Sequence, residues 1–216
     1  MRPQSEVKLA GLYPLADDDP RWRNDLRTVV EAALAGGVAL LQLRLKHTPD
    51  EEALGLCRWA VEQAHKAGAL LFVNDRFDLA DLAGADGVHL GQDDLPPERV
   101  PRELRRRLQV GLSTHTLDQV TQSRDRPVDY VAFGPVFGTA SKSSAYTPRG
   151  VECLRQAVQR AARPVVAIGG ITEQNLPQIH AAGACAAAVI SAIADAPDPT
   201  LATQRLIKSF GFPPEG

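Results

Sequence analysis

Short apolar runs alternate along the chain with longer segments in which apolar residues recur at helical spacing. Eight such runs cover residues 7–13, 38–45, 69–73, 87–90, 110–112, 130–133, 165–168 and 186–190. Several are apolar throughout, as expected of parallel strands that are covered on both faces. The alternation therefore predicts a parallel β-sheet whose strands are joined by helices.

This repetition has two architectural solutions, an open doubly wound sheet and a closed (β/α)8 barrel. Eight strands favour the barrel, which is an α/β fold of the TIM type. The chain has 216 residues, and no linker rich in Pro, Gly or Ser divides it. We therefore expect a single barrel domain over residues 1–216, with a frayed tail at 212–216.

Two helices have recognisable starts. In Thr48-Pro49-Asp50-Glu51, Thr48 is the expected N-cap and Glu51 completes a capping box. Pro177 stands inside the seventh expected helix, so that helix either begins near Asn175, with the proline in its first turn, or is kinked.

Composition excludes several classes of protein. The net charge is −2, from 24 basic and 26 acidic residues mixed along the chain, which argues against a nucleic-acid-binding surface. The three cysteines have no metal-ligand spacing, and no apolar run reaches the roughly 18 residues of a membrane span. The first residues contain no apolar signal core. These features predict a cytoplasmic protein with no membrane partner, and they leave the oligomeric state unknown.

Polar residues cluster where the expected strands end, which in such barrels is the working face. Gln42, Arg44 and Lys46 alternate with leucines, so they share one face of the second strand if that strand continues as far as Lys46. A buried cation needs an anionic partner. That partner is either a bound anion or a nearby aspartate of the protein.

Acidic residues follow the third and fourth strands, with Asp75 after one and Asp94 after the other. Helix capping is one interpretation, in which Asp75 caps the segment that follows it. Because adjacent strands lie about 4.8 Å apart, the two carboxylates can also converge on one point. Mg²⁺ typically takes one or two carboxylates and completes its shell with water and phosphate oxygens. We therefore expect Asp75 and Asp94 to bind Mg²⁺.

The fifth and sixth strands lead into segments rich in hydroxyl groups. Ser113-Thr114-His115-Thr116 follows the fifth strand; its hydroxyls can cap the next helix, and His115 lies either at the mouth of the barrel or on that helix. Residues 134–148 then form a loop far longer than the roughly 2–6 residues typical of such connections. This loop, which carries Lys142, is either a functional lid or a flexible insertion.

Glycines and a serine follow the last two strands, namely Gly169-Gly170 and Ser191. Exposed backbone N–H groups beside helix starts bind anions, and these two loops are the usual phosphate site of such barrels. The alternative for the glycine pair is a plain tight turn. The mouth is thus expected to hold a metal-bound diphosphate and, separately, a phosphate.

The same residues resemble those of thiamine phosphate synthases over essentially the whole chain. The resemblance rests on "QLRLK", "VNDR", "ADGVHLGQDD", "GLSTHT", "GPVFGTASK" and "IGGIT", in that order. It implies a (β/α)8 barrel enzyme that joins an aminomethylpyrimidine diphosphate to a thiazole phosphate with Mg²⁺, giving thiamine phosphate and pyrophosphate. Gln119 differs from the family, in which an acid is common at that position.

The resemblance also implies roles for individual residues. Asp75 and Asp94 would bind Mg²⁺, Ser113 and Lys142 would contact the pyrimidine substrate or the departing pyrophosphate, and Arg44 and Lys46 would neutralise that leaving group. The remaining positions would hold the pyrimidine diphosphate (Gln42, Arg44, Lys46, Asn74) or the thiazole phosphate (Thr139, Ser141, Gly170, Ile190, Ser191). Two rival functions are a thiazole tautomerase of the same superfamily and a non-catalytic sensor of phosphorylated ligands.

Overall fold

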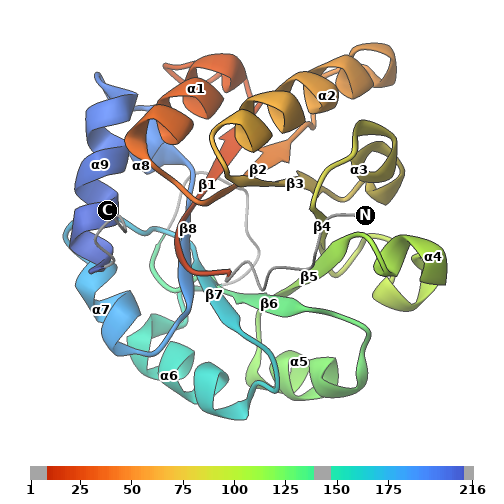
Figure 1. Cartoon of the computed structure of the whole chain (residues 1–216). Helices are drawn as coiled ribbons and strands as arrows, with labels where there is room; N and C mark the ends of the chain where they lie inside the picture. Colours follow the sequence, from red (N-terminus) through yellow and green to blue (C-terminus); the bar gives the residue numbers. More distant parts are fainter. Residues whose placement is uncertain (1–8, 139–146, 212–216) are drawn as a thin grey trace.

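Eight parallel strands form a closed barrel in the computed structural model, which describes residues 9–138 and 147–211. The strands follow sequence order, and β1 pairs with β8 to close the ring (Figure 1). The strands are β1 (Gly11–Asp17), β2 (Leu40–Arg44), β3 (Leu70–Asn74), β4 (Gly87–Leu90), β5 (Gln109–Thr114), β6 (Tyr130–Phe133), β7 (Val165–Ile168) and β8 (Ala186–Val189). The predicted (β/α)8 barrel is confirmed.

Helices surround this barrel, and α9 closes the ring between α7 and α1 (Figure 1). The helices are α1 (Leu26–Gly36), α2 (Asp50–Lys66), α3 (Phe77–Ala83), α4 (Arg102–Arg105), α5 (Leu117–Gln122), α6 (Gly150–Arg160), α7 (Leu176–Ala181), α8 (Ser191–Ala194) and α9 (Pro199–Phe210), with 3₁₀ turns η1 (Pro97–Arg99) and η2 (Ser123–Asp125). Within the described ranges, no helix is both long and apolar enough to cross a membrane.

The strands bury both of their faces, which explains their nearly continuous apolar sequences. Outward-facing residues such as Leu41 and Leu71 pack under the helices in the larger core. Inward-facing residues such as Leu40 and Phe72 fill the barrel itself. Gly111 belongs to this packing, because a Cβ at that position would lie 2.1 Å from the ring of Tyr130.

The first strand was predicted at residues 7–13, and this prediction is wrong by four residues. β1 runs from Gly11 to Asp17 and includes the buried Pro14. A proline is expected to end a strand, because it has no N–H to donate. Here the burial of Leu12, Leu15 and Ala16 extends the strand past the proline.

The capping role predicted for Thr48 is also wrong. Helix α2 starts at Asp50, and no side chain caps it. The Thr48 hydroxyl instead donates to Asp18 at 2.8 Å. The first alternative for Pro177 is confirmed, since α7 begins at Leu176 and holds the proline in its first turn.

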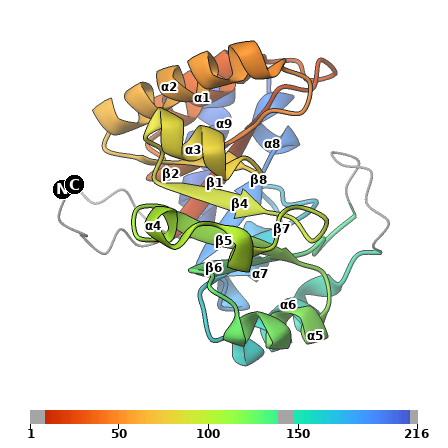
Figure 2. The ribbon, with the colours of Figure 1, turned by 90° about the vertical axis from the view of Figure 1, so that its right-hand side faces the viewer.

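Parallel strands bring all their carboxyl ends to one end of the barrel, on the right in Figure 2. The polar residues that follow each strand therefore meet there. Polar residues that are far apart in the sequence are thereby brought to the same end of the barrel.

Candidate active site

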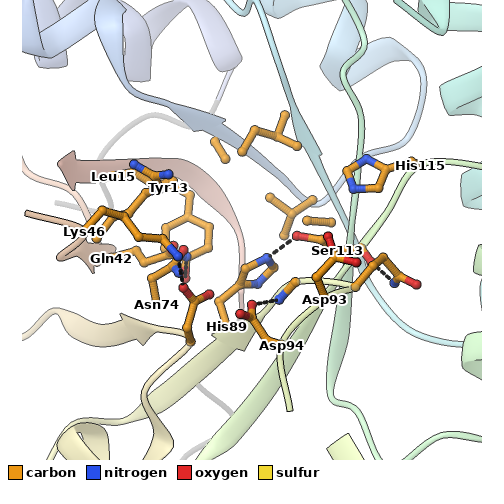
Figure 3. Close-up of a pocket in the computed structure, with 18 residues that line it drawn as sticks. Tyr13, Leu15, Gln42, Lys46, Asn74, His89, Asp93, Asp94, Ser113 and His115 are labelled. Carbon is orange, nitrogen blue, oxygen red and sulfur yellow. Dashed lines mark hydrogen bonds and ion pairs between the residues drawn. The ribbon is translucent and has the colours of Figure 1, made fainter. Parts of the chain in front are cut away.

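A cavity of about 500 Å³ opens at the carboxyl ends of the strands. Gln42, Lys46 and Asn74 lie along one side, Ser113 and His115 lie along the other, and His89 lies between them (Figure 3). The complete lining comprises Tyr13, Leu15, Gln42, Arg44, Lys46, Asn74, Asp75, His89, Gly91, Gln92, Asp93, Asp94, Ser113, His115, Ala132, Val166, Ile168 and Ala188. Many of the predicted site residues thus share one space.

Gln42, Arg44 and Lys46 all line this cavity as predicted, but β2 ends at Arg44, so Lys46 enters the cavity from the turn that follows. Both cations also have carboxylate partners. The Arg44 guanidinium lies 2.5 Å from Asp17 Oδ2, and Lys46 Nζ forms an ion pair with Asp75. The ion-pair interpretation is therefore confirmed, and the binding of an anion by the two cations stays a prediction.

Asp75 has an unusual backbone, with a φ of 63° that is rare outside glycine. Its N–H donates to the carbonyl of His89 on the neighbouring strand at 2.7 Å. The side chain does not cap α3, whose N-cap is Arg76 and which has no side-chain cap. The capping interpretation of Asp75 is therefore wrong, and the carboxylate faces the cavity.

Asp94 is held next to the same space by the turn after β4. Its Oδ2 accepts a hydrogen bond from the Gly91 N–H at 2.6 Å. Burial raises the pKa of the Asp75 carboxyl above its ordinary value; the neighbouring Asp94 adds to the rise, and Lys46 opposes it. The two carboxylates therefore repel one another, and a bound cation would relieve this repulsion.

The chemistry of this pair fits a hard divalent cation. Carboxylate oxygens are the ligands that Mg²⁺ prefers. Among the described residues, no group of three or more His, Cys, Asp or Glu side chains could hold a metal ion. A cation here would therefore take the oxygens of Asp75 and Asp94 and fill its remaining positions with water or substrate.

A chain of hydrogen bonds crosses the floor of the cavity. Gln42 Nε2 donates to the Tyr13 hydroxyl at 3.0 Å, which lies 3.1 Å from the Tyr130 hydroxyl. His89 then joins Tyr130 to Ser113, with both contacts at 2.9 Å. Burial raises the pKa of both tyrosines far above their usual value, so both phenols stay neutral.

The sequence reasoning did not identify Tyr13, His89 or Tyr130 as site residues. A signal was present, because His89 and Tyr130 are the polar residues of otherwise apolar strands and Tyr13 stands among buried apolar residues of β1. A side chain with polar atoms in such a strand needs a hydrogen-bonding partner. In this barrel the partners come from β1, β2, β4, β5 and β6.

His115 lies at the mouth, which resolves its two predicted placements. Its Nδ1 lies 2.7 Å from the Gly134 carbonyl, and its N–H donates to Gln119 Oε1 at 2.6 Å. Thr116 caps α5 by accepting from the Gln119 N–H, so the predicted capping by a hydroxyl is confirmed there. The amide of Gln119 accepts the bond that a carboxylate would accept, so the substitution keeps this turn intact.

The predicted phosphate residues lie beside the cavity and do not line it. Gly170 follows β7, Ile190 precedes α8, and Ser191 is the first residue of α8. Gly170 has a φ of 61°, and a Cβ there would lie 2.2 Å from the Gly138 carbonyl oxygen. Glycine is thus required by the turn itself, and the phosphate role stays a prediction. Thr139, Ser141, Lys142 and the tail at 212–216 lie outside the described residues.

Comparisons with known proteins identify the family. A family model for thiamine monophosphate synthase matches residues 12–193. A thiamine-phosphate synthase of Roseiflexus sp. (strain RS-1) is 40% identical over 195 residues, which cover 90% of this chain and 83% of that protein. One from Synechococcus sp. (strain CC9605) is 47% identical over 189 residues, 87% of this chain and 53% of the relative. The chain thus spans about half the length of that relative.

Solved structures agree with this match. Thiamine phosphate pyrophosphorylase from Pyrococcus furiosus superposes with a TM-score of 0.84 at 34% identity, covering 95% of this chain and 97% of that one. A 3-hexulose-6-phosphate synthase superposes with a TM-score of 0.69 at 19% identity, covering 92% and 99%, and shows the fold alone. The resemblance found in the sequence is confirmed, and the chain belongs to the thiamine monophosphate synthase family.

Proposed function

We propose that this chain is an enzyme that forms thiamine phosphate in thiamine biosynthesis. One observation carries the proposal: Arg44 and Lys46 share a cavity with the Asp75–Asp94 pair. Two cations beside two carboxylates suit a diphosphate that arrives with a divalent cation. The family relationship supports the same assignment.

The substrates would be 4-amino-2-methyl-5-hydroxymethylpyrimidine diphosphate and 4-methyl-5-(2-phosphoethyl)thiazole, or the carboxylated form of the thiazole. Gln42, Asn74 and Ser113 would hold the pyrimidine. Gln42 supports this role, because its buried Oε1 has no hydrogen-bond partner among the described residues. A buried acceptor at a cavity wall suits a donor on the ligand, such as an amino group.

The reaction requires pyrophosphate to leave before or as the thiazole nitrogen attacks. Departure leaves positive charge on the pyrimidine methylene, which the amino group of the ring delocalises. Mg²⁺ held by Asp75 and Asp94 would supply charge neutralisation at the leaving group. Arg44, Lys46 and the loop residue Lys142 would contribute to the same end, so positioning and electrostatics would supply most of the rate.

The thiazole phosphate would bind beside the cavity. Gly170, Ile190 and Ser191 follow the last two strands, where barrels of this type bind phosphate. Thr139 and Ser141 of the loop after β6 would complete this site.

An assay for thiamine phosphate, with the two substrates and added Mg²⁺, tests the proposal. Chelator should abolish turnover, and Mg²⁺ should restore it. A thiazole tautomerase would isomerise the thiazole without coupling it, and a sensor would bind ligands without turnover. Full coupling in metal-free buffer would remove the cation from the proposal.

A further inference from the structure

Asp17 stands behind Arg44 without reaching the cavity. The two residues are register partners at the ends of β1 and β2. The Asp17 side chain is fully buried, and its Oδ2 lies 2.5 Å from Arg44 Nη1. Arg44 lines the cavity, whereas Asp17 does not. A buried carboxylate is costly without a cation, so this pair fixes where the guanidinium points.

Asp17 Oδ1 is also engaged, because it accepts a hydrogen bond from the Asp19 N–H at 3.0 Å. Both oxygens of the carboxylate are therefore held from different directions. The side chain has no freedom to follow Arg44 if the guanidinium moves, so it acts as a fixed anchor.

Asp18, the next residue, holds the turn that carries Lys46. Its carboxylate accepts from three successive backbone N–H groups, those of Lys46 at 2.8 Å, His47 at 2.9 Å and Thr48 at 2.7 Å. It accepts from the Thr48 hydroxyl as well. These hydrogen bonds lower the pKa of Asp18, although burial opposes the effect.

Because one carboxylate accepts hydrogen bonds from three consecutive N–H groups, it holds the turn of Lys46 in a single conformation. The Asp18 N–H adds a further restraint, because it donates to the Arg44 carbonyl at 3.1 Å. From this turn the Lys46 side chain reaches the cavity and Asp75. Asp18 thus sets the backbone position of Lys46, while the Lys46 side chain is paired with Asp75.

We propose that Asp17 and Asp18 are positioning residues for the diphosphate site: Asp17 orients the Arg44 guanidinium, and Asp18 fixes the turn of Lys46. This inference rests on the proposed function, since it assumes that Arg44 and Lys46 receive the diphosphate. It gives a role to Asp17 and Asp18, the acidic residues at the end of β1.

If Asp17 and Asp18 act only through their negative charge, their removal should change pyrophosphate binding in the opposite direction from the change expected if they position Arg44 and Lys46. Removing a negative charge near an anion site should tighten anion binding if only electrostatics matters. Removing an anchor should weaken it, because Arg44 or Lys46 then has to be ordered when the anion binds. The sign of the change therefore separates the two roles.

The test measures the binding of inorganic pyrophosphate with Mg²⁺ to the full chain by isothermal titration calorimetry. Asp17→Asn and Asp18→Asn should each weaken binding about 10- to 100-fold, the effect of losing one well-placed charged hydrogen bond. Asp19→Asn is the matched control, because Asp19 belongs to the same run but contacts Arg21 and His47. It should stay within about twofold of the unmodified chain, because Asp19 is partly exposed and pairs with neither Arg44 nor Lys46.

A double variant shows whether Asp17 acts through Arg44. In an Arg44→Gln background, Asp17→Asn should weaken pyrophosphate binding no further. The KM for the thiazole phosphate should stay unchanged in Asp17→Asn and Asp18→Asn, which a general loss of structure would not allow. Thermal melting shows whether each variant is folded. If Asp17→Asn does not fold, pyrophosphate binding by Asp18→Asn tests the inference.

Binding as tight as in the unmodified chain, or tighter, in both Asp17→Asn and Asp18→Asn would overturn the inference. If the unmodified chain does not bind pyrophosphate with Mg²⁺, the proposed function is wrong, and the inference, which assumes it, is wrong as well. The unmodified chain therefore tests the proposed function, and the Asp17→Asn and Asp18→Asn variants test the inference.

Discussion

Asp75 carries two energetic costs at once. Its φ of 63° belongs to a region that non-glycine residues rarely adopt, at a cost of about 1–3 kcal/mol. Its carboxyl is also partly buried next to Asp94, which raises its pKa. A residue that stays unfavourable in the free protein is typical of a functional site, where a ligand compensates for the cost.

Replacing Asp75 by asparagine should therefore raise the stability of the folded protein and weaken its proposed binding of Mg²⁺. Because the pKa of Asp75 is raised in the folded state, its ionisation opposes folding, and this penalty is present above that pKa and lost as the pH falls through it. We expect Asp75→Asn to gain on the order of 1 kcal/mol at neutral pH, or about 2–4 °C in Tm. Thermal melting as a function of pH measures the gain, which should vanish in acid.

Added Mg²⁺ provides the control for this variant. It should raise the Tm of the unmodified chain but not that of Asp75→Asn. Asp93→Asn, at an exposed residue of the same cavity, should respond to Mg²⁺ like the unmodified chain. An Asp75→Asn variant that melts lower at neutral pH would mean that the pair with Lys46 outweighs the repulsion by Asp94.

At the level of residues, the sequence revealed those groups whose placement follows from local alternation. Gln42 and Arg44 share a face because side chains alternate along β2, and Lys46 reaches the same cavity from the turn after that strand. The link from Tyr13 through Tyr130 to His89 joins residues 117 and 41 positions apart. Such contacts depend on the order of the strands around the barrel, and a local sequence pattern carries no information about that order.

Among the elements, the turns after β6 and β7 depend on one another. The N–H groups of Val136 and Phe137 donate to the carbonyls of Ile168 and Gly169, at 2.9 and 3.0 Å. Gly170 then passes so close to the Gly138 carbonyl that a Cβ has no room. A change at Gly170 therefore displaces both turns at the predicted phosphate site.

Gly170→Ala should raise the KM for the thiazole phosphate by about tenfold, comparable to the loss of one charged hydrogen bond. Binding of the pyrimidine diphosphate should be largely kept, because Arg44 and Lys46 belong to another part of the barrel. Steady-state kinetics with each substrate varied in turn measures both values.

Gly37→Ala is the matched control for the backbone. Gly37 also has a positive φ, but a Cβ there meets no atom within 4 Å. This variant should cost about 1 kcal/mol of stability and leave both KM values unchanged. Equal losses for both substrates in Gly170→Ala would instead indicate damage to the barrel.

Lys142 tests whether the loop after β6 takes part in the chemistry. A cation that meets the leaving oxygens as the C–O bond breaks affects turnover more than ground-state binding. Lys142→Ala should lower kcat by about 10²–10³, as for the loss of one oxyanion donor, and shift KM much less. Lys66→Ala, at an exposed lysine of α2 paired with Glu62, is the control. Wild-type turnover in Lys142→Ala would exclude the lysine from the mechanism.

Most element types followed from periodicity, and the errors came from contacts distant in sequence. The first strand was expected to end at residue 13, yet packing inside and outside the barrel carries β1 through Pro14 to Asp17. Thr48 had the sequence of an N-cap, yet Asp18, 30 residues earlier, captures its hydroxyl. In both cases a tertiary contact outweighs a correct local preference.

At the scale of the whole molecule, the site exists only when the barrel is closed. Its residues come from all eight strands and the turns that follow them. The pairing of β1 with β8 joins the two ends of the described chain. Neither half could bury its strand edges or complete the cavity alone.

This closure predicts that the chain unfolds as one cooperative unit. Both tryptophans, Trp22 and Trp59, lie in the first half, so their fluorescence reports on that half. Far-ultraviolet circular dichroism reports on all helices, including α6 and α9 in the second half. In urea, the two signals should give the same midpoint and slope, the test for a single transition. Separate midpoints would divide the chain into two domains.

Ligand binding should move that single transition as a whole. Pyrophosphate with Mg²⁺ at about 100 times its Kd should stabilise the folded state by about 2.7 kcal/mol. Arg44 ends β2, Asp75 follows β3 and Asp94 lies in the turn after β4. Because these residues, proposed to hold pyrophosphate and Mg²⁺, belong to three strands of one closed ring, both signals should shift to higher urea by the same amount. A shift seen in tryptophan fluorescence alone would show that the first half binds pyrophosphate and unfolds independently of the second.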